Sequence, residues 1–261
     1  MSVIAILCIL AIVLSITVFM VWASASIRSG VYVRAFCREK TDRKVVYLTF
    51  DDGPHPPETE RVLDVLRERG ARATFFLIGS KVSGNEALLR RMLEEGHALG
   101  LHTYSHAGTF PLLAFDKMLA DVNEGKRAVE SVAGKKISLF RPPFGVTNPT
   151  IAKVIRTLGL QTVGWDVRSF DTMFCKSSEH SCKQSGYSCK QSGYDWYVPV
   201  VERIMKQVRP GSVILLHDRL DGASSLLALL LDSLAASGYD FTRALPNTLT
   251  SSSDSSETNL S

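Results

Sequence analysis

Two adjacent carboxylates stand at the end of an apolar run early in the chain. The run Val45–Phe50 is followed by Asp51 and Asp52, and then by Gly53-Pro54, a dipeptide typical of turns. If the run is a strand of a parallel sheet, both carboxylates lie at its carboxyl end, where α/β enzymes collect catalytic groups. Adjacent residues leaving a strand point in different directions, so one carboxylate can bind a metal while the other faces a substrate. On its own, however, such a motif is more often an ordinary solvated turn.

Two histidines form a second group. His102 and His106 follow the apolar run Ala98–Leu101, and their i, i+4 spacing predicts that both imidazoles lie on one side of a helical turn. Together with Asp52 they would give one cation three ligands and leave a position open for water, as in catalytic zinc sites. Because such pairs also arise by chance, this prediction depends on what the other strand ends carry.

Arg141 and His217 end two further apolar runs. Arg141 begins RPPFG (141–145), and His217 belongs to LLHD (215–218). Taken singly, the arginine is more often a surface ion-pair partner and the histidine a hydrogen-bonded structural residue. In a parallel architecture, however, all these polar groups end strands, and we expect them to converge on one rim.

Short apolar runs alternate with amphipathic stretches from Val45 onward, which predicts repeated strand–helix units and a parallel sheet. Six or seven such units favour an α/β barrel, complete or incomplete. The expected strands are Val45–Phe50, Ala73–Ile78, Ala98–Leu101, Leu139–Arg141, Thr162–Trp165 and Val213–Leu216. The expected helices are Pro57–Arg69, Asn85–Glu95, Leu113–Val132, Pro149–Leu158, Val198–Val208 and Ser224–Ala236.

Five motifs in order resemble the polysaccharide deacetylases with a NodB-homology domain, carbohydrate esterase family 4. They are TFDDGP (49–54), HTYSH (102–106), RPPFG (141–145), WDVRSFD (165–171) and LLHD (215–218). The resemblance implies a distorted (β/α)7 barrel over residues 45–246 that removes acetyl groups, mainly N-acetyl, from a cell-envelope polysaccharide. Peptidoglycan N-acetylglucosamine is the first substrate to expect, followed by a chitin-like glycan. Hydrolysis of a non-polymeric amide and sugar binding without catalysis remain as alternatives.

The resemblance also implies a role for each motif residue. Zn²⁺ or another divalent transition metal would be held by Asp52, His102 and His106, with Asp51 as the catalytic base. Arg141 would orient Asp51, His217 would be the general acid, and Asp171 would tune that histidine. The expected substrate contacts are Pro143, Phe144 and Trp165.

The fourth motif departs from the family pattern. The family commonly has Asp-Ser-x-Asp-Trp, whereas this chain has Arg168-Ser169-Phe170-Asp171-Thr172, so an apolar wall of the groove is missing. An insertion at 174–197 follows, in which SCKQSGY (181–187) is repeated at 188–194. Its polar composition predicts an exposed loop. Trp196 or Tyr197 could replace the missing wall, but we favour a loop that lies in solvent.

The first 25 residues are predicted to anchor the chain in a membrane. Val3–Trp22 has no charge and no proline, and at about 1.5 Å per residue a helix of this length crosses the hydrocarbon core. A cleaved signal peptide is the competing interpretation, because Ala23-Ser24-Ala25 is typical of a cleavage site. The positive-inside rule favours a cytoplasmic domain, because the charges follow the span. The implied substrate instead places the catalytic domain outside the cytoplasm, and this is the location we expect.

Residues 26–44 are predicted to form a basic juxtamembrane linker. They hold six basic residues against Glu39 and Asp42, the whole net charge of +4, and such clusters meet anionic lipid headgroups. The remaining charges balance, so no basic face points to nucleic acid. The five cysteines are too irregular for a disulfide scaffold. Residues 247–261 are rich in serine and predicted to be a disordered tail.

Overall fold

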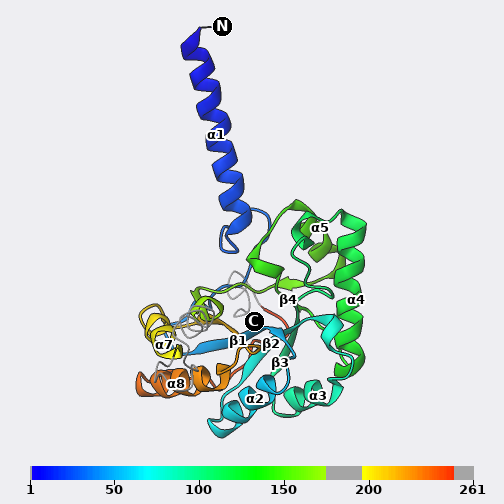
Figure 1. Ribbon diagram of the computed structural model, residues 1–261, viewed down its shortest axis with the longest axis vertical. Coiled ribbons are helices and arrows are strands. Elements are labelled where there is room, and N and C mark those ends of the chain that lie inside the picture. Colours follow the sequence, from blue (N-terminus) through cyan, green and yellow to red (C-terminus); the bar gives the residue numbers. More distant parts are fainter. Residues whose placement is uncertain (1, 175–195, 250–261) are drawn as a thin grey trace, which may run out of the picture.

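The computed structural model describes residues 2–174 and 196–249 (Figure 1). The tandem heptapeptide, the three cysteines at 175, 182 and 189 and the tail from residue 250 onward lie outside these ranges. The predictions made for them stay predictions.

A parallel sheet of seven strands forms the centre of the domain, in the order β5-β4-β3-β2-β1-β7-β6. Its two edge strands, β5 and β6, do not pair, so the sheet is a curled, open barrel and the predicted distorted (β/α)7 architecture is confirmed. The strands are β1 (Val46–Gly53), β2 (Ala73–Leu77), β3 (Ala98–Leu101), β4 (Leu139–Phe140), β5 (Gln161–Thr162), β6 (Val167–Arg168) and β7 (Ser212–His217).

Helices cover the outside of the sheet, with α3, α4 and α5 towards one side and α7 and α8 towards the other (Figure 1). They are α2 (Glu58–Glu68), α3 (Glu86–Glu94), α4 (Phe115–Ala133), α5 (Pro149–Leu158), α7 (Tyr197–Met205) and α8 (Ala223–Ala236). Single 3-10 turns are η1 (Gly79–Lys81), η2 (Phe110–Leu112) and η3 (Pro143–Gly145). Helices α4 and α5 end at glycines in the left-handed region, Gly134 and Gly159.

Both faces of the central strand β1 are buried, which explains why its sequence is nearly continuous in apolar residues. Towards the helices, Phe50 stacks on Phe75 of β2 with ring centroids 5.2 Å apart. Towards the interior of the barrel, Tyr47 packs in a smaller cluster with Phe76 and Val213. These two layers fix the position of β1, and therefore of the carboxylates at its end.

An apolar helix, α1 (Val3–Ala25), projects from the barrel (Figure 1). Its mean hydropathy of 3.1 and length of 23 residues are sufficient to cross a membrane. Its last turn contacts the domain, because Ala23 is fully buried and the backbone N–H of Thr147 donates to Ser24 O at 2.9 Å. The segment predicted as a linker also contacts the barrel: Phe36 donates its N–H to Thr162 O and accepts from the N–H of Gly164.

Candidate active site

A bulge at the end of β1 separates the two adjacent carboxylates. Asp51 is in register with Phe76 of β2 and His217 of β7, whereas Gly53 already pairs with Leu77, so Asp52 is the extra residue. Its φ of 73° lies in the left-handed region, which is strained for a non-glycine residue. The carboxylate of Asp51 therefore faces Arg141, while that of Asp52 faces the two histidines.

Asp52, His102 and His106 form a cluster whose ligand atoms all lie within 4.8 Å of one another. Nε2 of His106 is 3.3 Å from Asp52 Oδ1, and Nε2 of His102 is 3.6 Å from the same oxygen. Nδ1 of His102 lies 2.7 Å from the backbone oxygen of Arg141. If Nδ1 carries the proton and donates it there, Nε2 is left with a lone pair facing the cluster, as a metal ligand requires.

The protonation of this cluster suits a cation. Burial raises the pKa of Asp52, but His102, His217, a hydrogen bond from Arg219 and His106 together lower it to about 2. Burial lowers the pKa of His106, and the neighbouring His102 lowers it further. An ionised carboxylate and neutral imidazole are the forms that bind metal, so these residues fit a divalent transition metal such as Zn²⁺.

The predicted helical turn that would bring His102 and His106 together is wrong. Residues 102–106 form an irregular loop in which Thr103 and His106 have φ values of 65° and 48°. The loop is held from α4, because Asp121 accepts hydrogen bonds from the backbone N–H groups of Tyr104 and Ser105. The imidazoles still meet, with ring centroids 4.7 Å apart.

Arg141 is completely buried beside Asp51. Its guanidinium donates to Asp51 Oδ1 at 2.7 Å and to Thr49 Oγ1 at 2.9 Å. It also donates to the backbone oxygens of Val163 and Gly164, and it lies over the ring of Phe76. With partners on every side this guanidinium cannot turn, so the contact needed to orient the Asp51 carboxylate is present.

His217 and Asp171 meet where the neighbouring strands β7 and β6 end. Nδ1 of His217 is 2.8 Å from Asp171 Oδ1, and the backbone N–H of His217 donates to Asp171 Oδ2 at 2.9 Å. Burial lowers the pKa of His217, but the charge of Asp171 and its hydrogen bond raise it more, so the net direction is upward. The imidazolium form is thereby favoured, as a general acid requires.

Three charged residues near the site were given no role by the sequence prediction. Arg219 donates from Nε to Asp52 Oδ2 at 2.8 Å, and Lys81 donates to the backbone oxygen of Asp52. Asp218 is completely buried, and burial raises its pKa to about 6. Its carboxylate would lie 2.5 Å from a Cβ at position 53, which explains the glycine there. The only sequence signal for Arg219 was its place directly after LLHD.

The expected substrate contacts differ in exposure. Phe144 is 53% exposed, and its ring centroid lies 5.3 Å from that of His106. Trp165 is half-buried, and its ring leaves no room for a side chain at position 145. Pro143, by contrast, is buried, and the substrate contact expected there stays a prediction. Phe144 and Trp165 remain as the aromatic rings at the rim.

The ends of the insertion do not lie in solvent. Trp196 and Tyr197 are half-buried and pack against the hydrophobic core, with their ring centroids 6.1 Å apart. The indole of Trp196 lies next to Gly222, at the start of α8. The preference for solvent was wrong for these two residues, because their aromatic rings gain more from burial than the polar repeat that precedes them would.

The fold and the rim define an α/β-barrel enzyme with its polar groups gathered at the carboxyl ends of the strands. Residues 38–163 match the polysaccharide deacetylase family. A peptidoglycan-N-acetylglucosamine deacetylase of Bacillus cereus is 34% identical over 207 residues, which are 77% of this chain and 86% of that protein. The chain therefore belongs to the polysaccharide deacetylase family, hydrolases that act on carbon–nitrogen bonds.

Two further relatives show how the family divides. The peptidoglycan-N-acetylmuramic acid deacetylase PdaA of Bacillus subtilis is 33% identical over 79% of this chain and 72% of its own length. The crystal structure of the Bc1960 peptidoglycan N-acetylglucosamine deacetylase superposes with a TM-score of 0.66 at 27% identity, covering 79% of this chain and 88% of that one. Relatives of similar identity thus act on either of two sugars.

Proposed function

We propose that the chain removes N-acetyl groups from a cell-envelope glycan, with peptidoglycan N-acetylglucosamine as the first substrate to test. The observation that carries the proposal is the division of two adjacent carboxylates, with Asp51 bonded to Arg141 and Asp52 beside two histidines. A site of this kind provides a catalytic base and a metal ligand from two adjacent residues. The apolar helix α1 supports a membrane-anchored enzyme, and the envelope substrate is the reason to place its domain outside the cytoplasm.

The chemistry follows from the positions of the side chains. A divalent ion held by Asp52, His102 and His106 would polarise the acetyl carbonyl and stabilise the negative charge that develops on its oxygen. Asp51, fixed by Arg141, accepts a proton from the attacking water as the water oxygen bonds to the carbonyl carbon. The carbon–nitrogen bond then breaks while His217 donates the proton from Nε2 to the departing amine. Acetate and a free amino sugar result.

His217 is suited to this step because its other nitrogen is held by Asp171. A proton on Nδ1 is retained in that hydrogen bond, so the proton on Nε2 is the one available for transfer. An inactive sugar-binding protein would have no chemical need for this pair beside the metal cluster. A hydrolase of small amides would use the same groups, and only its substrate range would distinguish it.

The first experiment measures acetate release from a panel of acetylated glycans and small amides, together with bound metal, for the purified full chain. Chelation should abolish release, and the panel separates polymer from small amide. Asp52→Ala should lose the metal and the activity together. Asp51→Asn and His217→Ala should keep the metal, while turnover falls by about 10²–10⁴.

Asp232→Asn is a matched control, because this carboxylate lies on the outer surface of α8, paired with Arg69. It should keep both metal and activity. Metal loss from Asp51→Asn with retention by Asp52→Ala would reverse the two assignments. Full activity of all three site variants would refute the mechanism.

A further inference from the structure

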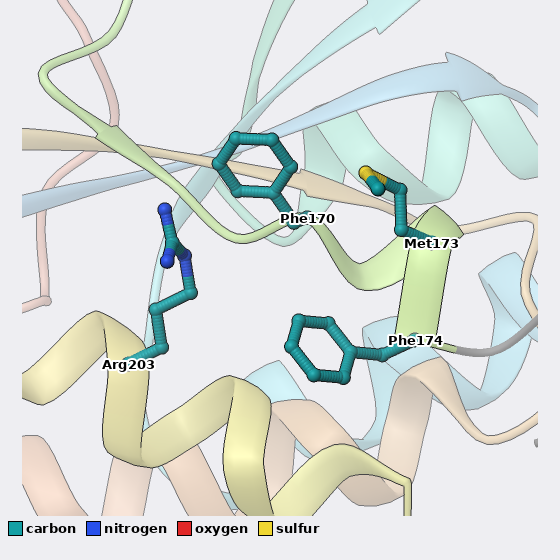
Figure 2. Close-up of a pocket in the computed structure, with 4 residues that line it drawn as sticks. All are labelled: Phe170, Met173, Phe174 and Arg203. Carbon is teal, nitrogen blue, oxygen red and sulfur yellow. The ribbon is translucent and has the colours of Figure 1, made fainter. Parts of the chain in front are cut away.

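A small pocket lies beside the edge strand β6, next to the active-site rim. Its volume is about 260 Å³, and it is lined by Phe170, Met173, Phe174 and Arg203. Figure 2 shows Arg203 extending from α7 towards the ring of Phe170, with the ring of Phe174 directed into the space between them. Pockets for whole small molecules are usually about 300–1,000 Å³, so this one fits a single substituent better than a sugar chain.

Two guanidinium groups converge on one aromatic ring at this pocket. The Cζ atoms of Arg203 and Arg168 lie 4.4 Å and 4.8 Å from the centroid of Phe170. Both arginines are exposed, and among residues 2–174 and 196–249 neither forms an ion pair with an acidic side chain. Two like charges on one ring, with no acidic partner among the described residues, create a positive potential that favours an anion.

The backbone at Phe170 is strained in order to place its ring. Its φ of 59° lies in the left-handed region, a conformation that is unfavourable for a residue with a Cβ. The next residue, Asp171, is the partner of His217, so the same turn places the ring of Phe170 and positions the general acid.

A row of contacts joins the pocket to the rim. The guanidinium of Arg168 lies 5.9 Å from the ring of Trp165, and that ring lies 5.5 Å from the guanidinium of Arg141. The row therefore runs from Arg141 through Trp165, Arg168 and Phe170 to Arg203. A glycan bound at the rim would have the pocket within reach of a side substituent.

We propose that this pocket binds a carboxylate-bearing substituent of the glycan, so that the enzyme prefers acidic acetylated glycans to neutral ones. This inference rests on the proposed deacetylase function. A short aliphatic chain that ends in a carboxylate matches the site, because Phe170, Met173 and Phe174 supply apolar surface and Arg203 supplies a charge-assisted hydrogen bond. Arg168 adds positive charge beside the ring of Phe170. The lactyl ether of muramic acid has this form, whereas a chitin-like glycan has no such group.

The experiment compares two substrates that differ only in that charge. One is an acetylated peptidoglycan tetrasaccharide with free lactyl carboxylates, and the other is the same glycan with the carboxylates converted to methylamides. The metal-loaded full chain should have a lower KM for the free acid. Arg203→Gln should raise that KM about tenfold, leaving kcat and the KM for the methylamide unchanged, because one charge-assisted contact is lost.

Arg156→Gln is the matched control, because it removes the same charge from an exposed position on α5 and should leave both KM values unchanged. If the first variant fails to fold, Arg168→Gln tests the second positive charge beside Phe170, with the same expected direction. Equal KM values for acid and methylamide in the wild-type chain, or an equal effect of Arg203→Gln on both, would overturn the inference. If the wild-type chain releases acetate from neither glycan, the binding of the same two compounds is measured by calorimetry. Tighter binding of the free acid would then support the pocket, and equal binding would overturn it, whatever the outcome for the proposed function.

Discussion

At the scale of single residues, one bulge accounts for how two neighbouring aspartates obtain different environments. Without the register shift after Asp51, alternation along β1 would direct Asp52 to the opposite face of the sheet. The left-handed φ of Asp52 turns its carboxylate back towards His106. Arg219 and Lys81 then hold the side chain and the backbone of Asp52, which offsets the strain of that conformation.

The Asp171–His217 pair predicts a specific pH dependence. Asp171→Asn removes the charge that raises the pKa of His217, while the burial that lowers this pKa remains. Because a general acid must be protonated to act, the alkaline limb of kcat/KM should move to lower pH in the variant. The measurement is the pH profile of acetate release with saturating metal, beside a metal-content assay.

Asp166→Asn serves as the control for that profile, since this carboxylate binds Ser212 and Arg209 at the opposite end of β7. Its alkaline limb should stay where the wild-type limb lies. An unchanged limb in Asp171→Asn would mean that another group supplies the proton.

The motif residues were identified from the sequence because each belongs to a short, ordered pattern, and the structure brings Asp51, Asp52, His102, His106, Arg141, Asp171 and His217 together on one rim. Arg219 could not be identified in this way. Its contact with Asp52 depends on the path of the chain after β7, which no local pattern specifies. Arg168 and Phe170 looked only like a departure from the family pattern, because their shared contact with Arg203 requires the packing of α7 against β6.

At the scale of elements, the length of each helix or strand determined whether its hydrophobic periodicity could predict it. The long strands β1, β2 and β7 and the amphipathic helices were predicted within a few residues. Strands β4, β5 and β6 have two residues each, too short for a periodic signal, and β6 was not predicted at all. The loop from His102 to His106 was mistaken for a helical turn, because its conformation depends on hydrogen bonds to Asp121 of α4.

A buried histidine directly before β3 predicts that the protein loses stability at acidic pH. His97 is 4% exposed, and its Nδ1 accepts a hydrogen bond from the N–H of Ala73. Burial lowers its pKa to about 4, although Glu95 opposes that shift. The unfolded chain, with a histidine pKa of about 6.5, binds the proton more readily. The free energy of unfolding should therefore fall by about 3 kcal/mol at most as the pH drops from about 6.5 towards 4.

His97→Gln keeps an acceptor for Ala73 but has no proton to gain, so its unfolding free energy should fall less over the same pH window. Denaturant titrations in detergent and chelator, followed by tryptophan fluorescence, measure this difference. Asp218 acts in the opposite direction, because burial raises its pKa to about 6 and favours the folded state as the pH falls. Only the difference between wild type and variant isolates His97, and parallel curves would contradict the assignment.

At the scale of the whole molecule, β5 and β6 do not pair, so the barrel has an open side in addition to the rim at the carboxyl ends of its strands. Closure of the sheet would have covered the edge of β6, along which Arg168 and Phe170 lie. The segment that follows α1 lies along the other edge, where Phe36 exchanges backbone hydrogen bonds with Thr162 and Gly164 of the β5 region. The N-terminal segment thus covers the unpaired edge of β5, and its continuation reaches the start of β7, where Arg38 pairs with Ser212.

The way α1 joins the barrel predicts that the helix is retained rather than cleaved. Ala23 is fully buried, Ser24 and Thr147 exchange two hydrogen bonds, and Ile27 is 5% exposed. Cleavage after Ala25 would remove the first two of these contacts and expose the third. We therefore expect the chain to fractionate with membranes when cells are broken. The intact mass of the purified protein should include α1. Protease added to intact cells should reach the barrel. A mass that begins at Ser26 would show that α1 is a signal peptide, and protection of the barrel in intact cells would place it in the cytoplasm.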